Sequence, residues 1–364
     1  MKKKGFTLIE LLAVIVVLAI IALIAIPIVM NAIEKSKKGA AERTADNYID
    51  AVEIAAATSK LDGKDILDGT YQIDEDGNLL VPSLPSGKLT VDMNGNKPSG
   101  GTISIKNNSV DQGKSNIKIG DYVVSYDKDN NKQTAEELYK GVLCTKKDGV
   151  DLNNLVVGNE FTCELGDNDT KTFYVLETNG DNVSLIMNAN IDSNGKAIMS
   201  SDATDKGLVA WITVDDWKKA GGVVTDAMRN DEGPCQYGNV CLTNEFGPLT
   251  AEATLKANTK TWTRLVSTQI VLPTGKQVAT AGGDTEWTEK NYTGTTLSTW
   301  LYDNLNGTTN AVSGVYGYWT STPYISDSYA CFVYHDGFLG NNGVDDSSRY
   351  GIRPVIIISK SNLK

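Results

Sequence analysis

A run of twenty residues without a polar side chain, from Leu11 to Met30, most limits how this chain of 364 residues can fold. As an α-helix, a run of this length can cross a bilayer. Lys2, Lys3 and Lys4 precede it, and the positive-inside tendency predicts that they stay on the cytoplasmic side. The polar remainder contains no second run of this kind, so it is expected on the outer side.

Three interpretations of this amino terminus compete. A cleaved secretory signal has an apolar region of only about 7–15 residues with a small-residue cleavage site behind it, whereas this run continues into more helix-forming sequence. A plain membrane anchor explains the run but not the segment before it, Gly5-Phe6-Thr7-Leu8-Ile9-Glu10. That segment resembles the cleavage motif of type IV prepilins almost residue for residue. The resemblance implies that a prepilin peptidase cuts between Gly5 and Phe6 and that Phe6 is then N-methylated.

Glu10 and Pro27 are the two residues of this segment with an expected role in assembly. A charged side chain in a membrane helix costs about 2.5–3.5 kcal/mol at the centre and less near an end, so Glu10 needs a partner. The resemblance implies that it neutralises the amine of Phe6 in a neighbouring subunit; the alternative is that it reaches the headgroups. Pro27 removes one helix hydrogen bond. The resemblance implies a kink or locally melted stretch there, whereas in a generic membrane helix it would be a tolerated kink.

Residues 1–5 are thus predicted to be a leader and residues 6–60 one long helix, of which 6–33 form the membrane or filament core. Beyond the apolar run, residues at spacings of three and four form one apolar face: Ala41, Ala45, Tyr48, Val52 and Ala55. The opposite face is charged: Glu42, Arg43, Asp46, Asp50 and Glu53. Gly63 is expected to cap the helix.

Residues 61–130 are predicted to form the antiparallel sheet on which this helix packs, because short β-prone runs there alternate with turn residues. Residues 131–155 are polar and are predicted to be a connector, in which Thr134 to Leu138 carry a capping pattern typical of a short helix. The expected fold class is α+β, with a long amino-terminal helix packed on an antiparallel sheet as in the pilin fold.

The composition changes at about Val156, since all six tryptophans lie beyond it. Near the carboxyl terminus, Gly317-Tyr318-Trp319-Thr320-Ser321-Thr322 is followed by Ala330-Cys331-Phe332-Val333 and then by Tyr350-Gly351-Ile352-Arg353-Pro354-Val355. This order of motifs resembles C-type-lectin-like domains of the formylglycine-generating-enzyme type. The resemblance implies that residues 156–364 form an α+β domain of that fold and serve as a binding domain.

Polar loops often form an exposed ligand face in that fold. The implied face consists of aromatic and polar side chains: Tyr324, Tyr329, Tyr334, His335, Asn341, Asn342, Asp345 and Asp346. The alternatives are that half or more of the aromatic ones pack internally and that the acidic loops are merely solvated. Trp319 is expected in the core, and Arg353 is expected to be structural and to pair with a buried carboxylate.

Neither a catalytic site nor a metal site is predicted. The paired cysteines with which the enzymatic relatives oxidise a substrate cysteine are not evident around Cys331. The Glu-Pro-Asn, Gln-Pro-Asp and Trp-Asn-Asp runs of calcium-dependent lectins do not occur in the sequence. A zinc site is not expected either, because His335 is the only histidine and no Cys-x-x-Cys is present. The chain is therefore predicted to be no enzyme and to need no cofactor.

Four cysteines are candidates for disulfides if this part is extracytoplasmic. The expected pairs are Cys144–Cys163 and Cys235–Cys241, with Cys331 left over, although sequence alone does not determine connectivity.

The formal net charge of −11 argues against a nucleic-acid partner, which needs a basic surface. The expected partners are other pilin subunits, a prepilin peptidase, the cytoplasmic membrane before assembly, and an unknown surface ligand, either glycan or protein. The chain is expected at the cytoplasmic membrane as a prepilin and afterwards in an extracellular pilus.

The predicted function is that of a structural subunit, of the minor kind, of a type IV pilus that displays an adhesive or ligand-binding domain. One alternative is a pseudopilin of a type II secretion or DNA-uptake machine, although such proteins are typically smaller. Another is an enzyme or sensor anchored by a helix.

Overall fold

The computed structural model divides the chain into two compact units, Met1–Glu137 and Leu138–Lys364. The described residues are 8–128, 130–166, 169–199, 204–211, 249–284, 287, 297–305, 316–324, 329–346 and 349–364. In the first part of the long helix only some side chains are described, and those of Glu10 and Pro27 are not among them; the side chains of residues 323 and 324 are not described either.

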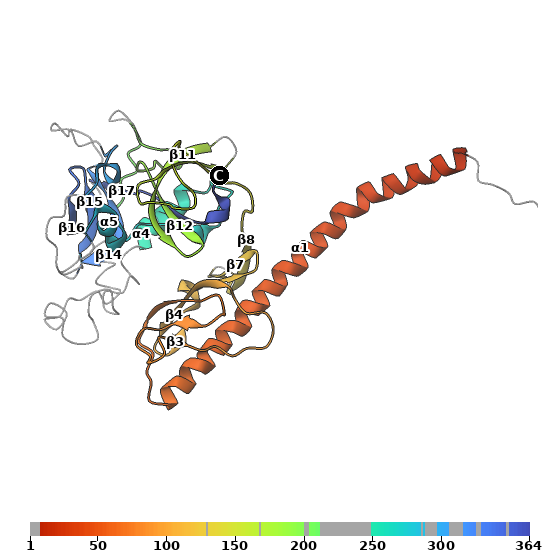
Figure 1. Cartoon of the computed structure of the whole chain (residues 1–364), viewed down its shortest axis with the longest axis horizontal. Coiled ribbons are helices and arrows are strands. Elements are labelled where there is room, and N and C mark those ends of the chain that lie inside the picture. Colours follow the sequence, from red (N-terminus) through yellow and green to blue (C-terminus); the bar gives the residue numbers. More distant parts are fainter. Residues whose placement is uncertain are drawn as a thin grey trace, which may run out of the picture. The chain divides into compact units, whose positions relative to one another are not determined.

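Helix α1 (Leu8–Leu61) confirms the predicted long helix from its first described residue onward. It is continuous through Pro27, and its ribbon curves smoothly (Figure 1). The helix ends where it was expected to end: the backbone N–H of Gly63 donates to the carbonyl of Lys60 over 3.0 Å, and Gly63 has a left-handed φ of 72°.

The first unit contains an antiparallel sheet in the order β1-β4-β6-β7-β8 and a small β2–β3 ladder. Its strands are β1 (Gly69–Gln72), β2 (Leu79–Leu80), β3 (Lys88–Leu89), β4 (Gly100–Lys106), β5 (Ser109–Val110), β6 (Asn116–Ile119), β7 (Tyr122–Asp127) and β8 (Lys132–Glu137). Strand β5 pairs with the carboxyl-terminal end of β4, on the same side of β4 as β6. The carboxyl-terminal half of α1 packs on this sheet, whereas its amino-terminal half extends beyond it (Figure 1).

The predicted apolar face of α1 is the face that packs on the sheet. Ala41, Ala45, Tyr48 and Val52 are fully buried in one hydrophobic core with Ile103, Ile105 and Val124 of the sheet, and Ala55 is partly buried against the same core. The period of the apolar residues therefore located this contact correctly.

Two acidic residues assigned to the opposite face have a different role from the one expected. The backbone N–H of Ala135 in β8 donates to a carboxylate oxygen of Glu42 over 3.1 Å, and that of Val110 in β5 donates to Glu53 over 3.0 Å. Strand β8 lies at an edge of the sheet, and the short β5 pairs with β4 alone among the described strands, so each has backbone groups without a neighbouring strand. The two glutamates thus fasten the helix to the edge strand β8 and to the short strand β5.

The prediction of a connector over 131–155, and of a short helix beginning at Thr134, is wrong. Residues 132–137 form β8, which pairs with β7 along its whole length, from Tyr122 opposite Glu137 to Asp127 opposite Lys132. The first unit therefore extends to Glu137, and β9 of the second unit already begins at Cys144. Pairing with β7 decides the structure of this segment, because the capping box that would favour a helix contributes only about 1 kcal/mol.

The second unit contains two sheets. The six-stranded sheet has the order β13-β18-β12-β11-β10-β9, and the four-stranded sheet has the order β16-β15-β14-β17, in which β17 runs parallel to β14. The strands are β9 (Cys144–Lys146), β10 (Glu160–Gly166), β11 (Asp169–Asn179), β12 (Asn182–Met187), β13 (Ile270–Val271), β14 (Gly317–Tyr324), β15 (Tyr329–Tyr334), β16 (Leu339–Gly343), β17 (Tyr350–Gly351) and β18 (Val355–Ser359). Two helices accompany them, α4 (Leu249–Asn258) and α5 (Gly275–Gly282).

The four-stranded sheet separates two hydrophobic cores. Trp319, Phe332 and Tyr350 belong to one core, whereas Tyr318, Cys331 and Val333 belong to the other. Successive residues of a strand point to opposite faces, which is why neighbours in the two predicted motifs divide between the cores. The α+β class is confirmed for both units.

Candidate functional site

The amino-terminal processing site lies partly outside the described residues. Gly5 and Phe6 are not described, and Glu10 is placed only as a backbone position near the start of α1. Its predicted pairing with an amine therefore stays a prediction.

Large apolar side chains are exposed along the part of α1 that extends beyond the sheet. Leu23 is 78% exposed, Ile28 64% and Met30 60%. Apolar surface of this extent normally marks a contact with lipid or with another protein. Counting the described residues alone, no helix has the length and apolar character of a membrane span.

A hollow of about 430 Å³ lies on the four-stranded sheet of the second unit. It is lined by Phe332, Tyr334, Asp336, Phe338, Arg349 and Tyr350. The residues come from β15, from the turn that joins β15 to β16, and from Arg349 and Tyr350 at the start of β17, so the hollow forms only when the sheet is assembled. Its volume falls in the range of small-ligand pockets, about 300–1,000 Å³.

Strand alternation places the aromatic side chains of this hollow. Phe332 and Tyr334 are two residues apart on β15 and therefore share a face. The rings of Phe332 and Tyr350 lie 4.4 Å apart between centroids, and those of Phe332 and Tyr334 lie 5.9 Å apart. Trp319 supports this layer from the core side: its ring is 4.6 Å from that of Tyr350, and its indole N–H donates to the carbonyl of Val209 over 2.7 Å.

A tight turn brings Asp336 and Phe338 to the hollow. The backbone N–H of Gly337 donates to the carbonyl of Tyr334 over 3.0 Å, and that of Phe338 donates to a carboxylate oxygen of Asp336 over 3.0 Å. Gly337 has a φ of 84°, and a Cβ there would lie 2.5 Å from the ring of Tyr302. Glycine is therefore required at this position on both grounds.

A polar network holds the opposite rim. The side-chain amide of Asn342 donates to Asp346 over 2.9 Å and to the hydroxyl of Tyr350 over 3.1 Å. Asp346 in turn lies 3.7 Å from Nε of Arg349, whose guanidinium group lies 5.9 Å from the centre of the Tyr316 ring.

The tyrosines of the hollow stay protonated at neutral pH. Burial is the largest cause that raises the pKa of Tyr350, to about 12, and burial likewise raises the pKa of Tyr334. Their hydroxyl groups are therefore neutral donors and acceptors over the physiological range.

The predicted ligand face is divided by the sheet. Tyr334 and Asn342 lie on the face of the hollow, His335 follows Tyr334 with its ring 4.2 Å away, and Asp346 belongs to the rim network. Tyr329 and Asn341 are in register with Gly343 and Cys331 and so have the opposite parity. Tyr324 is in register with Tyr329, and Asp345 is exposed beyond β16.

Sequence reasoning missed Phe332, Asp336, Phe338, Arg349 and Tyr350 as residues of the hollow. The alternation of Phe332 and Tyr334 on one β-prone run was a usable signal for two of the rings. The contributions of Arg349 and Tyr350 depend on the parallel pairing of β17 with β14, which no local pattern predicts.

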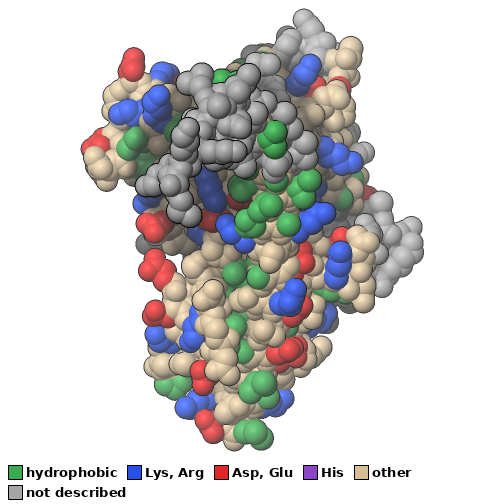
Figure 2. All heavy atoms as spheres, turned by 90° about the vertical axis from the view of Figure 1, so that its right-hand side faces the viewer, with side chains coloured by type: hydrophobic (Ala, Val, Ile, Leu, Met, Phe, Trp, Pro, Cys, Tyr) green, Lys and Arg blue, Asp and Glu red, His purple; other side chains and the backbone are tan. Residues whose placement is uncertain are grey.

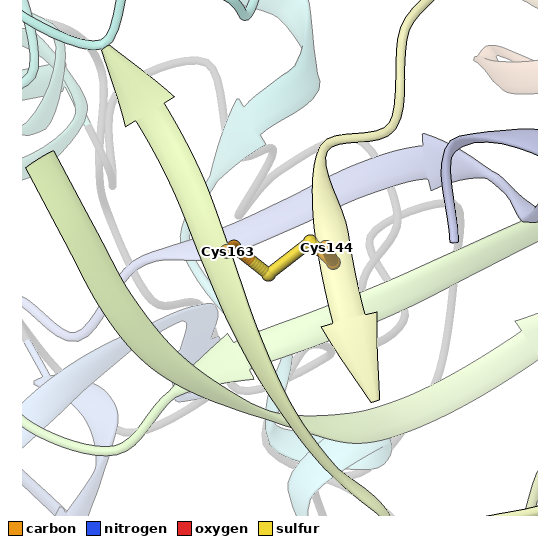
Figure 3. Close-up of a disulfide and its surroundings, with 2 residues drawn as sticks. All are labelled: Cys144 and Cys163. Atoms are coloured by element: carbon orange, nitrogen blue, oxygen red, sulfur yellow. A yellow bond between two sulfur atoms is a disulfide. The ribbon is translucent and has the colours of Figure 1, made fainter. Parts of the chain in front are cut away.

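Three of the five cysteines lie in the described residues. Cys144 and Cys163, one of the predicted pairs, are joined by a disulfide between β9 and β10, two strands in which they lie directly opposite each other (Figure 3). Cys331 is a buried thiol. Cys235 and Cys241 lie outside the described residues. In the described part of the chain, no three His, Cys, Asp or Glu side chains are grouped to hold a metal ion.

Arg353 is structural, as expected, but the expected carboxylate partner is wrong. The side chain is fully buried, and its guanidinium group donates to the carbonyls of Met187, Trp300 and Leu301. Burial is the largest cause that lowers the pKa of Arg353, and the nearby Tyr318 opposes it.

The described residues on the face shown in Figure 2 form no continuous basic stripe. Acidic and basic side chains are interspersed over the face shown in Figure 2. Interspersed charge of this kind is typical of a solvated surface rather than of a phosphate-binding one.

Comparison with known proteins gives a match at the amino terminus. Residues 1–26 match the family model of the prokaryotic N-terminal methylation motif. No curated protein and no solved structure gives a significant match. The match covers the predicted leader, the cleavage site, Glu10 and most of the apolar run, and it fits a type IV pilin or pseudopilin-type subunit.

Proposed function

We propose that this chain is a structural subunit of a type IV pilus that carries a ligand-binding unit at its carboxyl terminus. The observation that carries the proposal is the methylation motif at residues 1–26, which leads directly into helix α1. A helix that is exposed and apolar in one half and packed on an antiparallel sheet in the other is suited to join a filament while displaying a folded unit.

The proposed route begins at the cytoplasmic membrane. A prepilin peptidase hydrolyses the bond between Gly5 and Phe6, and the new amine of Phe6 is methylated. Glu10 then pairs with the amine of a neighbouring subunit, which removes the cost of a lone charge in an apolar environment. The exposed apolar side chains of α1 pass from lipid into contact with neighbouring helices, so they stay away from water throughout.

The second unit supports a binding role through its own two cores and its aromatic hollow. The three motifs behind the resemblance to C-type-lectin-like domains correspond to β14, β15 and the segment from β17 to β18. We propose that the unit has this kind of fold and acts as an adhesive or ligand-binding domain of a minor pilin.

Mass spectrometry of the protein from its native membrane tests the processing. The expected amino terminus is N-methylated Phe6; a chain that still begins at Met1 would contradict the proposal. Sheared pilus fractions then test assembly, because a pseudopilin would be processed in the same way but would be absent from long filaments.

The variant Glu10→Gln tests the charge pairing. It keeps the size of the side chain and removes its charge, so we expect normal membrane insertion and processing but a loss of at least about tenfold in the filament fraction. Glu34→Gln is the matched control, since Glu34 is exposed on the same helix beyond the apolar run. Equal incorporation of both variants would argue against a role for Glu10 in assembly.

A further inference from the structure

We propose that the hollow formed by Phe332, Tyr334, Asp336, Phe338, Arg349 and Tyr350 binds a neutral sugar ring without a metal ion. The inference deepens the proposed function and rests on it only for its biological setting, because the binding itself is a property of the second unit.

Two rings of the hollow are accessible and two are buried. Phe338 is 38% exposed and Tyr334 is half-buried, whereas Phe332 and Tyr350 are buried. The rings of Phe332 and Tyr350 are fixed from below by Trp319, so the surface requires little ordering when a ligand binds. Rigid aromatic faces with polar tips are the side chains that recognition surfaces favour.

The polar groups lie at the rim. Asp336 accepts hydrogen bonds through its carboxylate, and Arg349 offers a planar fork of donors. A hydrocarbon ligand would cover these two charges without satisfying them, which is unfavourable. The ligand should therefore have an apolar face for the rings and a periphery of hydroxyl groups for Asp336 and Arg349. A sugar ring has this character, with C–H bonds on its face and hydroxyl groups around it.

The local charge selects among sugars. Arg349 is already paired with Asp346, and Asp336 adds a further negative charge to the lining. These carboxylates would repel an anionic sugar, and the chain as a whole also has a net charge of −11. A quaternary ammonium group would suit the rings but has neither an acceptor for the N–H groups of Arg349 nor a donor for the carboxylate of Asp336. A neutral sugar avoids both conflicts.

The experiment uses the purified full chain in a detergent without a sugar headgroup, with a chelator present. Saturation-transfer NMR and calorimetry are run with methyl glycosides of glucose, galactose, mannose and N-acetylglucosamine. N-acetylneuraminic acid and choline chloride are the anionic and cationic probes. We expect at least one neutral glycoside to bind, and to bind at least about tenfold more tightly than either charged probe.

Variants assign the binding to the hollow. Phe338→Ala and Tyr334→Ala are expected to weaken binding by at least about tenfold, whereas Tyr334→Phe keeps the ring and should stay within about threefold of the parent. Tyr139→Ala is the control, since Tyr139 is a comparably exposed ring of the same unit that does not line the hollow. Near-ultraviolet circular dichroism checks that each variant is folded.

Three results would overturn the inference: no neutral glycoside binds, a charged probe binds more tightly, or folded Phe338→Ala and Tyr334→Ala bind like the parent. None of these results bears on cleavage after Gly5 or on filament incorporation. A failure of the sugar site is therefore distinguishable from a failure of the proposed function.

Discussion

Arg353 shows how a single buried charge can organise residues that are far apart in sequence. Its three carbonyl partners, on Met187, Trp300 and Leu301, come from the end of β12 and from the short helical turn over Thr299–Leu301. The ring of Tyr318 lies 5.2 Å from the guanidinium carbon. The planar fork of arginine can satisfy several fixed carbonyls at once, which an ammonium group cannot do in the same geometry.

The variant Arg353→Lys should therefore destabilise the second unit strongly. We expect a loss of about 3 kcal/mol in the free energy of unfolding, because the lysine leaves buried carbonyls unsatisfied and keeps a buried charge. Urea unfolding followed by tryptophan fluorescence measures it, since all six tryptophans lie in this unit.

The control for the Arg353→Lys variant is Arg264→Lys. Arg264 lies 2.9 Å from Glu164, whose side chain is 45% exposed, and an ion pair in contact with solvent contributes less than about 1 kcal/mol. Equal losses in the two variants would show that the carbonyl network of Arg353 is not what stabilises the unit.

At the scale of elements, the contact between α1 and the first sheet combines an apolar face with two glutamate side chains that accept hydrogen bonds from backbone N–H groups. The apolar face supplies most of the attraction, because it buries Tyr48, Val52 and several alanines in one core. Glu42 and Glu53 accept hydrogen bonds from backbone N–H groups of the edge strand β8 and of the short strand β5. Glu42 also occupies one backbone donor of the β8 edge, which hinders the pairing of that edge with another chain.

Removal of the Glu42 carboxylate should loosen β8. We expect Glu42→Ala to lower the local stability of β7 and β8 by about 1–2 kcal/mol, because a charge-assisted hydrogen bond is lost. Glu42→Gln keeps an acceptor and should recover most of the loss. Hydrogen–deuterium exchange of peptides from β7 and β8 measures this, since tryptophan fluorescence does not report on the first unit.

Asp50→Ala is the matched control for the helix, because Asp50 is exposed on the same element. We expect no change in the exchange of β8 for this variant. If Asp50→Ala accelerated exchange as much as Glu42→Ala, the effect would come from the charge of the helix and not from the hydrogen bond to Ala135.

At the scale of the whole molecule, buried tyrosines in both units give the chain a common sensitivity to alkali. Burial, assisted by Asp74, raises the pKa of Tyr48 in the first unit. In the second unit burial raises the pKa values of Tyr318 and Tyr350 to about 12, from an ordinary value of 10.0. The folded state therefore holds its protons more tightly than the unfolded state does.

The sign of the pH dependence follows from this difference. Below pH 10.0 these tyrosines are neutral in both states, so their contribution to stability is complete; between about 10 and 12 the unfolded chain ionises first and stability falls. We expect the denaturation midpoint of the second unit to decrease over this range. Tyr318→Phe should show a weaker decrease although it is less stable at neutral pH, because it loses the hydrogen bond to Leu301.

Ultraviolet absorbance of tyrosinate, measured beside the unfolding transition, checks the assignment. A fraction of the tyrosines should titrate only as the chain unfolds. Titration of every tyrosine near pH 10.0 in the folded protein would contradict the burial argument.

The sequence by itself determined the features that depend on neighbouring residues. The apolar run, the spacing of Ala41, Ala45 and Tyr48, and the turn at Gly63 led directly to α1 and to the face by which it packs. The motif from Gly5 to Glu10 predicted a prepilin-like amino terminus, which agrees with the match to the methylation motif at residues 1–26. Helical period and chemical motifs are local properties, so a single sequence carries them in full.

Only the tertiary structure decided the features that depend on strand register and on distant partners. Strand β8 exists because β7 and Glu42 supply its hydrogen bonds, although its own residues favoured a helix start. The hollow exists because the register of β14 to β17 brings Tyr334 and Tyr350 to one face and turns Tyr329 to the other. A shift of one residue exchanges the two faces of a strand, and the partners that prevent that shift are remote in the sequence.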